Sequence, residues 1–198
     1  MDRYATGMPT LYLAIEPAAD ELLATDPLAL LIGMLLDQQI PLEHAFSAPY
    51  QLRQRLGHDL DVRELAGYDT DALIAIFAQR PALHRFPKAM AARVQELCRL
   101  VVERYDGDPA RVWTEAKTGA ELAKRVGELP GFGRQKAQIF VALLAKQFGV
   151  RPDGWREASG VFGEDGSYKS VADIVDADSL AKVRSYKQQM KAAAKAGG

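Results

Sequence analysis

Apolar residues recur three or four positions apart along most of this chain, a spacing typical of helices that bury one face. The clearest example is the segment 88–105, whose apolar stripe consists of Met90, Val94, Leu97, Val101 and Val102. Weaker amphipathic patterns cover 42–56, 69–79 and 135–148, and the run "PLALLIGMLL" at 27–36 is apolar enough for a core helix. The sequence has no strand-like alternation of useful length. We therefore predict an all-α fold.

Capping and turn residues mark the ends of these predicted helices. Asp26 is an N-cap candidate ahead of a proline that suits the first helical position, and Thr118 is a second N-cap candidate. Pro49 interrupts the pattern of 42–56 and predicts a kink or a new start there. The chain beyond Gly149 is rich in Gly, Asp and Pro, which predicts irregular structure, and residues 178–198 predict an exposed helix that frays.

The composition is that of an ordinary globular protein, because 48% of the 198 residues are hydrophobic and 26% are charged. The net charge of −1 argues against a surface that is basic throughout and leaves room for a local basic patch. Cys98 is the single cysteine, which excludes an internal disulfide framework and a cysteine-ligated metal or iron–sulfur cluster. A signal-peptide pattern and an apolar run of 18 residues are both missing, so we expect a cytoplasmic protein without a membrane partner.

Between two predicted helices lies the string "LPGFGRQKAQ", in which Gly131 and Gly133 precede Arg134 and Lys136. The start of a helix presents unpaired backbone N–H groups and a partial positive charge, and these attract an anion. We expect both glycines to permit positive φ and close approach of a phosphate. Over residues 121–151 six basic residues stand against two acidic ones, in agreement with such a site. The alternative is an ordinary turn between helices.

The longer string "LPGFGRQKA" resembles the helix-hairpin-helix signature of the HhH-GPD superfamily of base-excision DNA glycosylases. The segments "LALLIGMLLDQQIPLEHAF" and "ALHRFPKAMAARVQELCRLV" also look like parts of the endonuclease III-like members, so the resemblance covers about 27–153. It implies a two-lobed helical fold that binds double-stranded DNA. One lobe would comprise 1–26 with 106–198 and the other 27–145, with the hairpin at about 118–148 and the lobes interleaved.

The resemblance implies a catalytic carboxylate at Asp153, which follows the hairpin at the spacing of the superfamily's aspartate. Such a group would stabilise an oxocarbenium-like sugar or activate water as the N-glycosidic bond breaks. The superfamily continues Val-Asp-Thr/Ser-His-Val, whereas this chain continues Asp-Gly-Trp, and an Asp-Gly pair is also an ordinary turn. Asp37 is an alternative carboxylate.

Two further positions follow from the resemblance. Bifunctional members carry a Schiff-base lysine at the seventh residue of the hairpin string, where this chain has Gln135. Lys136 is one position later, turned by about 100°, so we expect a monofunctional enzyme in which Lys136 is a phosphate contact or a solvated lysine. Gln39 aligns with the glutamine that fills the gap left by a flipped base, unless it is only the polar end of a helix. The implied DNA contacts are Gln39, Gly131, Phe132, Gly133, Arg134, Gln135 and Lys136.

The aromatic residues Trp155, Phe46, Tyr50 and Phe86 are candidates for stacking on an extruded base, although aromatic residues on helices usually belong to the core. The resemblance also implies a monovalent cation held by the backbone carbonyls of Gly127, Leu129 and Phe132. We expect no required cofactor and no iron–sulfur cluster.

The C-terminal tail is basic, and a solvated helix end or extra contact with DNA would each account for it. Its basic residues are Lys182, Arg184, Lys187, Lys191 and Lys195. Three functions follow from the sequence: a monofunctional DNA N-glycosylase associated with the nucleoid, a catalytically silent DNA-binding protein, and a helical interaction protein without a ligand at the hairpin. The sequence specifies no protein partner, no particular damaged base and no oligomeric state.

Overall fold

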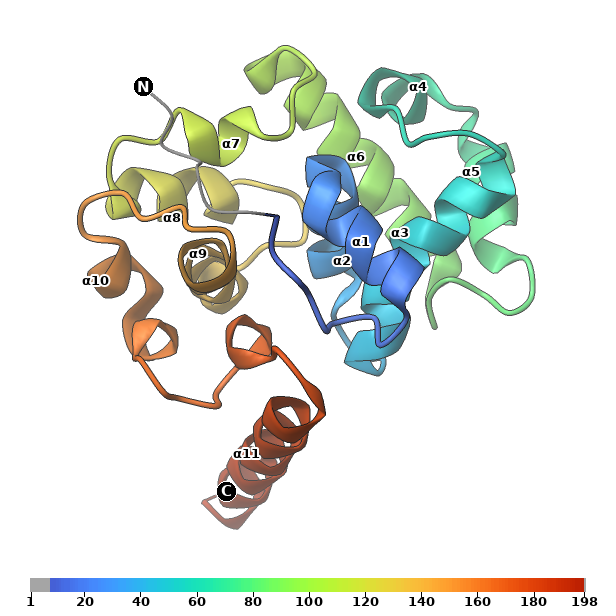
Figure 1. Cartoon of the computed structure of the whole chain (residues 1–198). Helices are drawn as coiled ribbons and strands as arrows, with labels where there is room; N and C mark the ends of the chain where they lie inside the picture. Colours follow the sequence, from blue (N-terminus) through green and yellow to red (C-terminus); the bar gives the residue numbers. More distant parts are fainter. Residues whose placement is uncertain (1–7, 198) are drawn as a thin grey trace.

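The computed structural model describes residues 8–197, which form eleven α-helices and two short 3-10 helices (Figure 1). Within this range the only strand-like pairing is an isolated bridge between Thr118 and Asp153. The prediction of an all-α fold is therefore confirmed. None of the helices over 8–197 is both long enough and apolar enough to cross a membrane.

Three helices form the N-terminal part of the core. Helix α1 (Pro17–Thr25) packs on α2 (Pro27–Leu36) and α3 (Leu42–Leu56). All of α2 except its first residue is buried, and the Asp26 side chain accepts hydrogen bonds from the amides of Leu28 and Ala29, which confirms the predicted N-cap. The new helix start that the sequence allows at Pro49 is absent, because α3 runs through it as one helix. Pro49 is buried in the packed face of α3, and tertiary packing outweighs the hydrogen bond that proline removes.

The next three helices cover the other side of this core (Figure 1). Helices α4 (Val62–Gly67) and α5 (Thr70–Ala78) both pack on the long α6 (Pro87–Tyr105). The predicted stripe of α6 is buried, except that Val102 is only half-buried. Helix α6 ends where Asp106 adopts a left-handed conformation, at the turn that the sequence predicts.

After the short α7 (Arg111–Thr114), helices α8 (Gly119–Gly127) and α9 (Arg134–Gln147) pack against each other. Thr118 caps α8 as predicted, since its hydroxyl accepts a hydrogen bond from the Glu121 amide. The segment after α9 is less irregular than expected. It contains α10 (Trp155–Ser159), η1 (Gly160–Gly163) and η2 (Val171–Asp173), all of which pack on α9.

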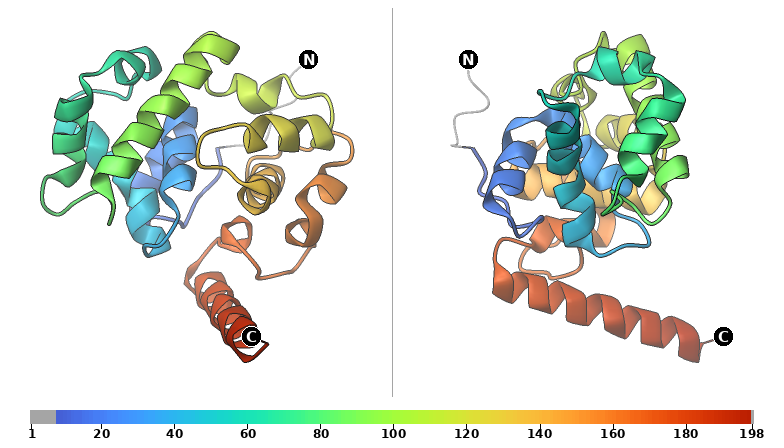
Figure 2. Two further views of the ribbon diagram at one scale, coloured as in Figure 1. Left: turned by 180° about the vertical axis from the view of Figure 1, so that it is seen from behind. Right: turned by 90° about the vertical axis from the view of Figure 1, so that its right-hand side faces the viewer.

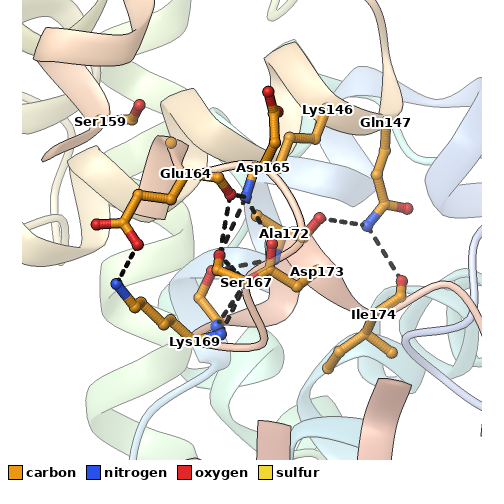
Figure 3. A network of polar contacts seen from close by, with 12 residues as sticks. Lys146, Gln147, Ser159, Glu164, Asp165, Ser167, Lys169, Ala172, Asp173 and Ile174 are labelled. Atoms are coloured by element: carbon orange, nitrogen blue, oxygen red, sulfur yellow. Dashed lines mark hydrogen bonds and ion pairs between the residues drawn. The ribbon is translucent and has the colours of Figure 1, made fainter. Parts of the chain in front are cut away.

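A network of polar contacts ties this late segment to the end of α9 (Figure 3). Lys146 Nζ lies 2.6 Å from Asp173 Oδ1 and donates a hydrogen bond to the carbonyl of Glu164. The side-chain amide of Gln147 donates to three backbone carbonyls of the η2 region, those of Val171, Ala172 and Ile174. These contacts hold the chain shortly before α11 (Ala177–Ala196) against the end of α9.

Helix α11 extends away from the rest of the molecule (Figure 2). Only Ser179, Leu180 and Val183 are buried, and all three lie in its first two turns. Arg184 then forms an ion pair with Glu43 of α3, with 2.8 Å between Nη2 and Oε1. From residue 187 onward the helix is exposed, in agreement with the sequence-based expectation of an exposed helix.

Candidate nucleic-acid interface

A cleft of about 1150 Å³ lies where three segments meet: the loop between α2 and α3, the start of α9, and the middle of α11. Five residues that the sequence marks as DNA contacts line it together, namely Gln39, Gly133, Arg134, Gln135 and Lys136. The first of these is about one hundred residues away in sequence from the others, so the fold brings the two predicted groups into one site.

The loop from α8 to α9 has a buried base and an exposed end. Leu129 and Phe132 are buried, while Gly133 is exposed. Gly131 has φ of +82°, as expected, but Gly133 has φ of −82° and an extended ψ. The prediction of positive φ is therefore wrong for Gly133, which instead serves as the N-cap of α9, where an extended conformation is normal.

The amides at the start of α9 are available to a ligand. Gly133 offers no side chain to cap them, and α9 has no side-chain cap hydrogen bond. A Cβ added at Gly133 would meet no atom within 4 Å, so the space in front of this helix end is open. Unpaired N–H groups beside an open cleft form a site that suits an anion.

Lys136 points toward the C-terminal end of α2. Its Nζ donates a hydrogen bond of 3.1 Å to the carbonyl of Leu35 and lies 5.8 Å from the centre of the Phe132 ring. Burial lowers the pKa of the Lys136 amine to about 8, although the nearby Asp37 opposes this shift. Lys136 is therefore not a freely solvated lysine, and it ties the hairpin region to α2.

Asp37 stands at the C-terminus of α2 and lines the same cleft. Burial raises the pKa of its carboxyl group, whereas the positive charges of Lys187 and Lys136 lower it. A carboxylate and an amine with shifted pKa values thus share one cleft, an arrangement that is enriched at functional sites.

The loop that carries Gln39 is held in an uncommon conformation. Gln39 is exposed and has φ of +58°, a region that non-glycine residues seldom adopt. His84, fully buried, supports the loop from behind, because its Nε2 lies 2.9 Å from the carbonyl of Gln38. The Phe86 amide donates to His84 Nδ1, so Nε2 carries the hydrogen and donates to Gln38. No local pattern in the sequence indicates this role of His84, because its partner is distant along the chain.

Asp153, the carboxylate implied by the resemblance, lies outside this cleft. It is exposed and lines a separate pocket together with Trp113 and Arg151. Its backbone carbonyl accepts a hydrogen bond of 2.8 Å from the Gly119 amide at the start of α8. The structure therefore brings Asp37, and not Asp153, into the cleft with Gln39 and Lys136.

The four aromatic candidates for a base pocket also lie outside the cleft. Phe46 is fully enclosed in the core, so its ring has no free face for a base. Tyr50 lines a different pocket beside α1, and Trp155 has the guanidinium of Arg156 4.6 Å from its ring centre. Phe86 is 41% exposed but is not among the residues that line the cleft. The apolar part of the cleft has no aromatic ring and consists of Met34, Ile40, Pro41, Leu42 and Ile139.

The three carbonyls proposed for a cation lie at the end of α8 and in the loop after it. The carbonyl of Leu129 already accepts a hydrogen bond of 3.0 Å from the Phe132 amide, which leaves one lone pair for another ligand. Gly127 is the last residue of α8, and Phe132 lies buried between the two glycines.

Positive charge dominates the rim of the cleft. Its basic residues are Arg85, Arg134, Lys136, Arg184, Lys187 and Lys191, and its acidic residues are Asp37 and Glu43. Since Glu43 is paired with Arg184, most of the remaining charge is positive. A cleft with this charge balance and an open helix N-terminus favours a polyanionic ligand.

Comparisons with known proteins give no further guide to this site. No protein-family model matches the chain, and neither a curated protein nor a solved structure matches it.

Proposed function

We propose that this protein binds double-stranded DNA in the cleft and acts as a monofunctional DNA N-glycosylase of base-excision repair. The observation that carries the proposal is that one basic cleft contains the open N-terminus of α9, the exposed Gln39 and the half-buried Asp37. The helices α8 and α9 would then form a helix-hairpin-helix motif within a two-lobed glycosylase fold. Its site of action would be the DNA of the cytoplasmic nucleoid.

The DNA backbone would be held at the start of α9. The amides that follow Gly133 would donate to a phosphate oxygen, and Arg134 would add charge. The missing side chain at Gly133 allows the phosphate to approach the backbone closely. Lys136 would contribute a positive charge from the α2 side of the cleft, and its hydrogen bond to the Leu35 carbonyl joins the start of α9 to α2.

Gln39 would enter the duplex and occupy the space of an extruded nucleotide. Its left-handed conformation keeps the side chain at an exposed position, and His84 fixes the preceding peptide through the Gln38 carbonyl. A rigid support matters because flipping a base costs a few kcal/mol of stacking and pairing energy.

The proposed carboxylate is Asp37, with Asp153 as the position implied by the resemblance alone. A water molecule would attack C1′ of the deoxyribose, the N-glycosidic electron pair would leave with the base, and the carboxylate would stabilise the positive charge on the sugar or accept the proton of water. The raised pKa of Asp37 makes it a stronger base than an exposed aspartate. Its position beside Gln39 puts it near the nucleotide that Gln39 would displace.

The alternative function is a catalytically silent protein that recognises DNA through the same cleft. The observation that favours it is the aliphatic lining, because enzymes that flip bases usually stack the base on an aromatic ring. Such a protein needs the basic rim and the start of α9, and it does not need Asp37.

The two functions are distinguished by base release. Duplexes carrying alkylated, oxidised, deaminated or mismatched bases would be incubated with wild type, Asp37→Asn and Asp153→Asn, and strand breaks would be scored with and without alkali. We expect alkali-dependent breaks with wild type, a rate about 100-fold lower in Asp37→Asn, and a nearly unchanged rate in Asp153→Asn. Both variants keep the side-chain size, so each is the control for the other.

The outcomes separate the proposals. Loss of activity only in Asp153→Asn would assign the catalytic carboxylate to Asp153 in place of Asp37. A DNA adduct trapped by borohydride in wild type and lost in Lys136→Met would contradict monofunctional chemistry. DNA binding without base release from any duplex would support the silent protein.

A further inference from the structure

The exposed part of α11 carries its positive charges on one face. At 100° per residue, Arg184, Lys187, Lys191 and Lys195 fall within an arc of about 80° around the helix. Lys182 lies on the opposite side, where it pairs with Asp178 at 2.6 Å. We call the first four residues the basic stripe of α11.

The basic stripe faces the proposed DNA site. Arg184, Lys187 and Lys191 all line the cleft opposite the start of α9, and the charge of Lys187 acts on the carboxyl of Asp37. Lys195 continues the same line one turn beyond the cleft. The ion pair of Arg184 with Glu43 joins the helix to α3 in this orientation.

Most of the stripe is free to bind a ligand. Among the residues that the structure describes, Lys187, Lys191 and Lys195 have no acidic partner within ion-pair distance, and all three are exposed. The sequence from 179 to the end contains no acidic residue. Three unpaired lysines on one face repel each other, and an extended anion would relieve that repulsion.

We infer that α11 is a second DNA-binding element, which lays its basic stripe along the phosphodiester backbone of the duplex held at α9. The inference rests on the DNA-binding part of the proposed function and does not require catalysis. From Arg184 to Lys195 the stripe is about 16 Å long, comparable to the rise of about five base pairs. DNA is the partner that fits, because the stripe continues the wall of a cleft whose other wall is an open helix N-terminus.

The test measures how DNA affinity depends on salt. Affinities of wild type, Lys187→Gln, Lys191→Gln, the triple variant Lys187→Gln/Lys191→Gln/Lys195→Gln and the control Lys182→Gln would be measured for one undamaged duplex at several salt concentrations. Each lost phosphate contact reduces the magnitude of the slope of log affinity against log salt by about 0.9. The slope of the triple variant should therefore be about 2.7 smaller in magnitude than that of wild type. The control should keep the wild-type slope, because Lys182 faces away. Glutamine favours helices as lysine does, and circular dichroism would verify that α11 is intact.

The possible failures are distinguishable. If wild type binds the duplex and the triple variant has the slope of Lys182→Gln, the inference about α11 is overturned and the proposed function stands. If wild type does not bind any duplex, both are overturned. Lysine-dependent binding to vesicles of acidic phospholipid, without binding to DNA, would also overturn the inference and assign the stripe to a membrane surface.

Discussion

His84 Nε2 lies 2.9 Å from the carbonyl oxygen of Gln38, a contact that spans 46 residues of sequence. This contact joins the buried His84, in the loop before α6, to the peptide group between Gln38 and Gln39. Both imidazole nitrogens are engaged, because Nδ1 accepts a hydrogen bond from the Phe86 amide. A protonated imidazole cannot accept that bond, so the support beneath Gln39 depends on a neutral His84.

We expect stability to fall in acid because of His84. Burial lowers the pKa of His84 below its ordinary value of 6.5. The unfolded chain therefore binds a proton more readily than the folded chain, and the stabilisation present above pH 6.5 is lost as the pH falls from there toward the lowered pKa. Urea unfolding from pH 7.5 to 5 would measure this loss.

The matched variants are His84→Gln and His58→Gln. His84→Gln should cost about 1–3 kcal/mol at pH 7.5, since it disturbs two buried hydrogen bonds, and its stability should vary less with pH than that of wild type. His58 is on the surface, 3.4 Å from Glu64 and remote from the Gln39 loop, so His58→Gln is the control for replacing a histidine that does not support that loop. If the stability of His84→Gln fell in acid as much as that of wild type, a group other than His84 would cause the acid sensitivity.

The two glycines of the α8–α9 loop should respond differently to substitution. Gly131→Ala should lower stability by about 1–2 kcal/mol, because φ is +82° and the added Cβ would lie 3.3 Å from Leu35 Cγ. Gly133→Ala should cost less, about 0.5–1 kcal/mol, because its φ is −82° and its Cβ would be in open space, so only the poorer N-cap preference of alanine counts. Thermal unfolding of the two variants side by side would measure the difference.

Gly133→Asp gives a sharper test of the anion site. The new carboxylate would cap the amides of α9 and should raise stability by a few tenths of a kcal/mol. The same carboxylate would occupy the phosphate position and repel DNA, so affinity should fall at least about tenfold. Higher stability together with unchanged DNA affinity would exclude the start of α9 from the DNA-binding surface.

The sequence predicts the helices well because their signals are local. Asp26 and Thr118, the two N-cap candidates, each cap the helix that begins beside them in the structure. Two places differ: Pro49 begins no new helix, since its effect depends on packing against other helices, and α10 forms in a segment expected to be irregular. Local patterns therefore specify most helix starts in this chain.

The assembly of the site could not be predicted in this way. Asp37 and Lys136 are almost one hundred residues apart, and only the packing of α9 beside the end of α2 brings them into one cleft. Helix α11 is joined to α3 by Glu43 and Arg184, which are 141 residues apart in the sequence. The sequence resemblance indicated Asp153, but the loop geometry directs that residue into another pocket.

Lys136 should make DNA binding weaker at alkaline pH. Its amine has a pKa of about 8 because burial disfavours the charged form. DNA phosphate favours the charged form, so affinity should decrease as the pH rises through about 8. In Lys136→Met this decrease should disappear, whereas Lys124→Met, on the preceding helix and outside the cleft, should retain it. Fluorescence anisotropy at fixed salt would measure both profiles, and a persistent step in Lys136→Met would assign the titration to another group.

The same variant has a predicted effect on folding. The pKa of Lys136 is lower in the folded protein than the 10.5 of a free lysine, so the unfolded chain binds the proton more tightly. Stability should therefore rise as the pH increases from about 8 toward 10.5, and below pH 8 the full cost of burying the charge remains. Lys136→Met should be more stable than wild type at pH 7, by about 1 kcal/mol after allowance for solvent screening. Binding sites commonly lower the stability of the folded protein in this way. If Lys136→Met were instead less stable than wild type, the hydrogen bond from Lys136 to the Leu35 carbonyl would contribute more to stability than burial of the charge costs.

Lys146 and Asp173 should matter to the direction of α11 as well as to stability. Their side chains are mostly buried, at 14% and 4% exposure, and their charged atoms are 2.6 Å apart (Figure 3). Removing one partner leaves a buried charge unpaired, so Lys146→Met should cost about 3–5 kcal/mol.

The double variant Lys146→Met/Asp173→Asn should recover part of that loss, which a double-mutant cycle of urea unfolding would measure. Asp173 also accepts hydrogen bonds from the amides of Lys169 and Ser170, and asparagine preserves only some of them, so recovery should be incomplete. Because these contacts hold the segment from which α11 starts, the double variant should also bind DNA with a smaller salt dependence, while the start of α9 and the loop between α2 and α3 remain in place. An unchanged salt dependence in a folded double variant would show that Leu180, Val183 and the Arg184–Glu43 pair suffice to orient α11.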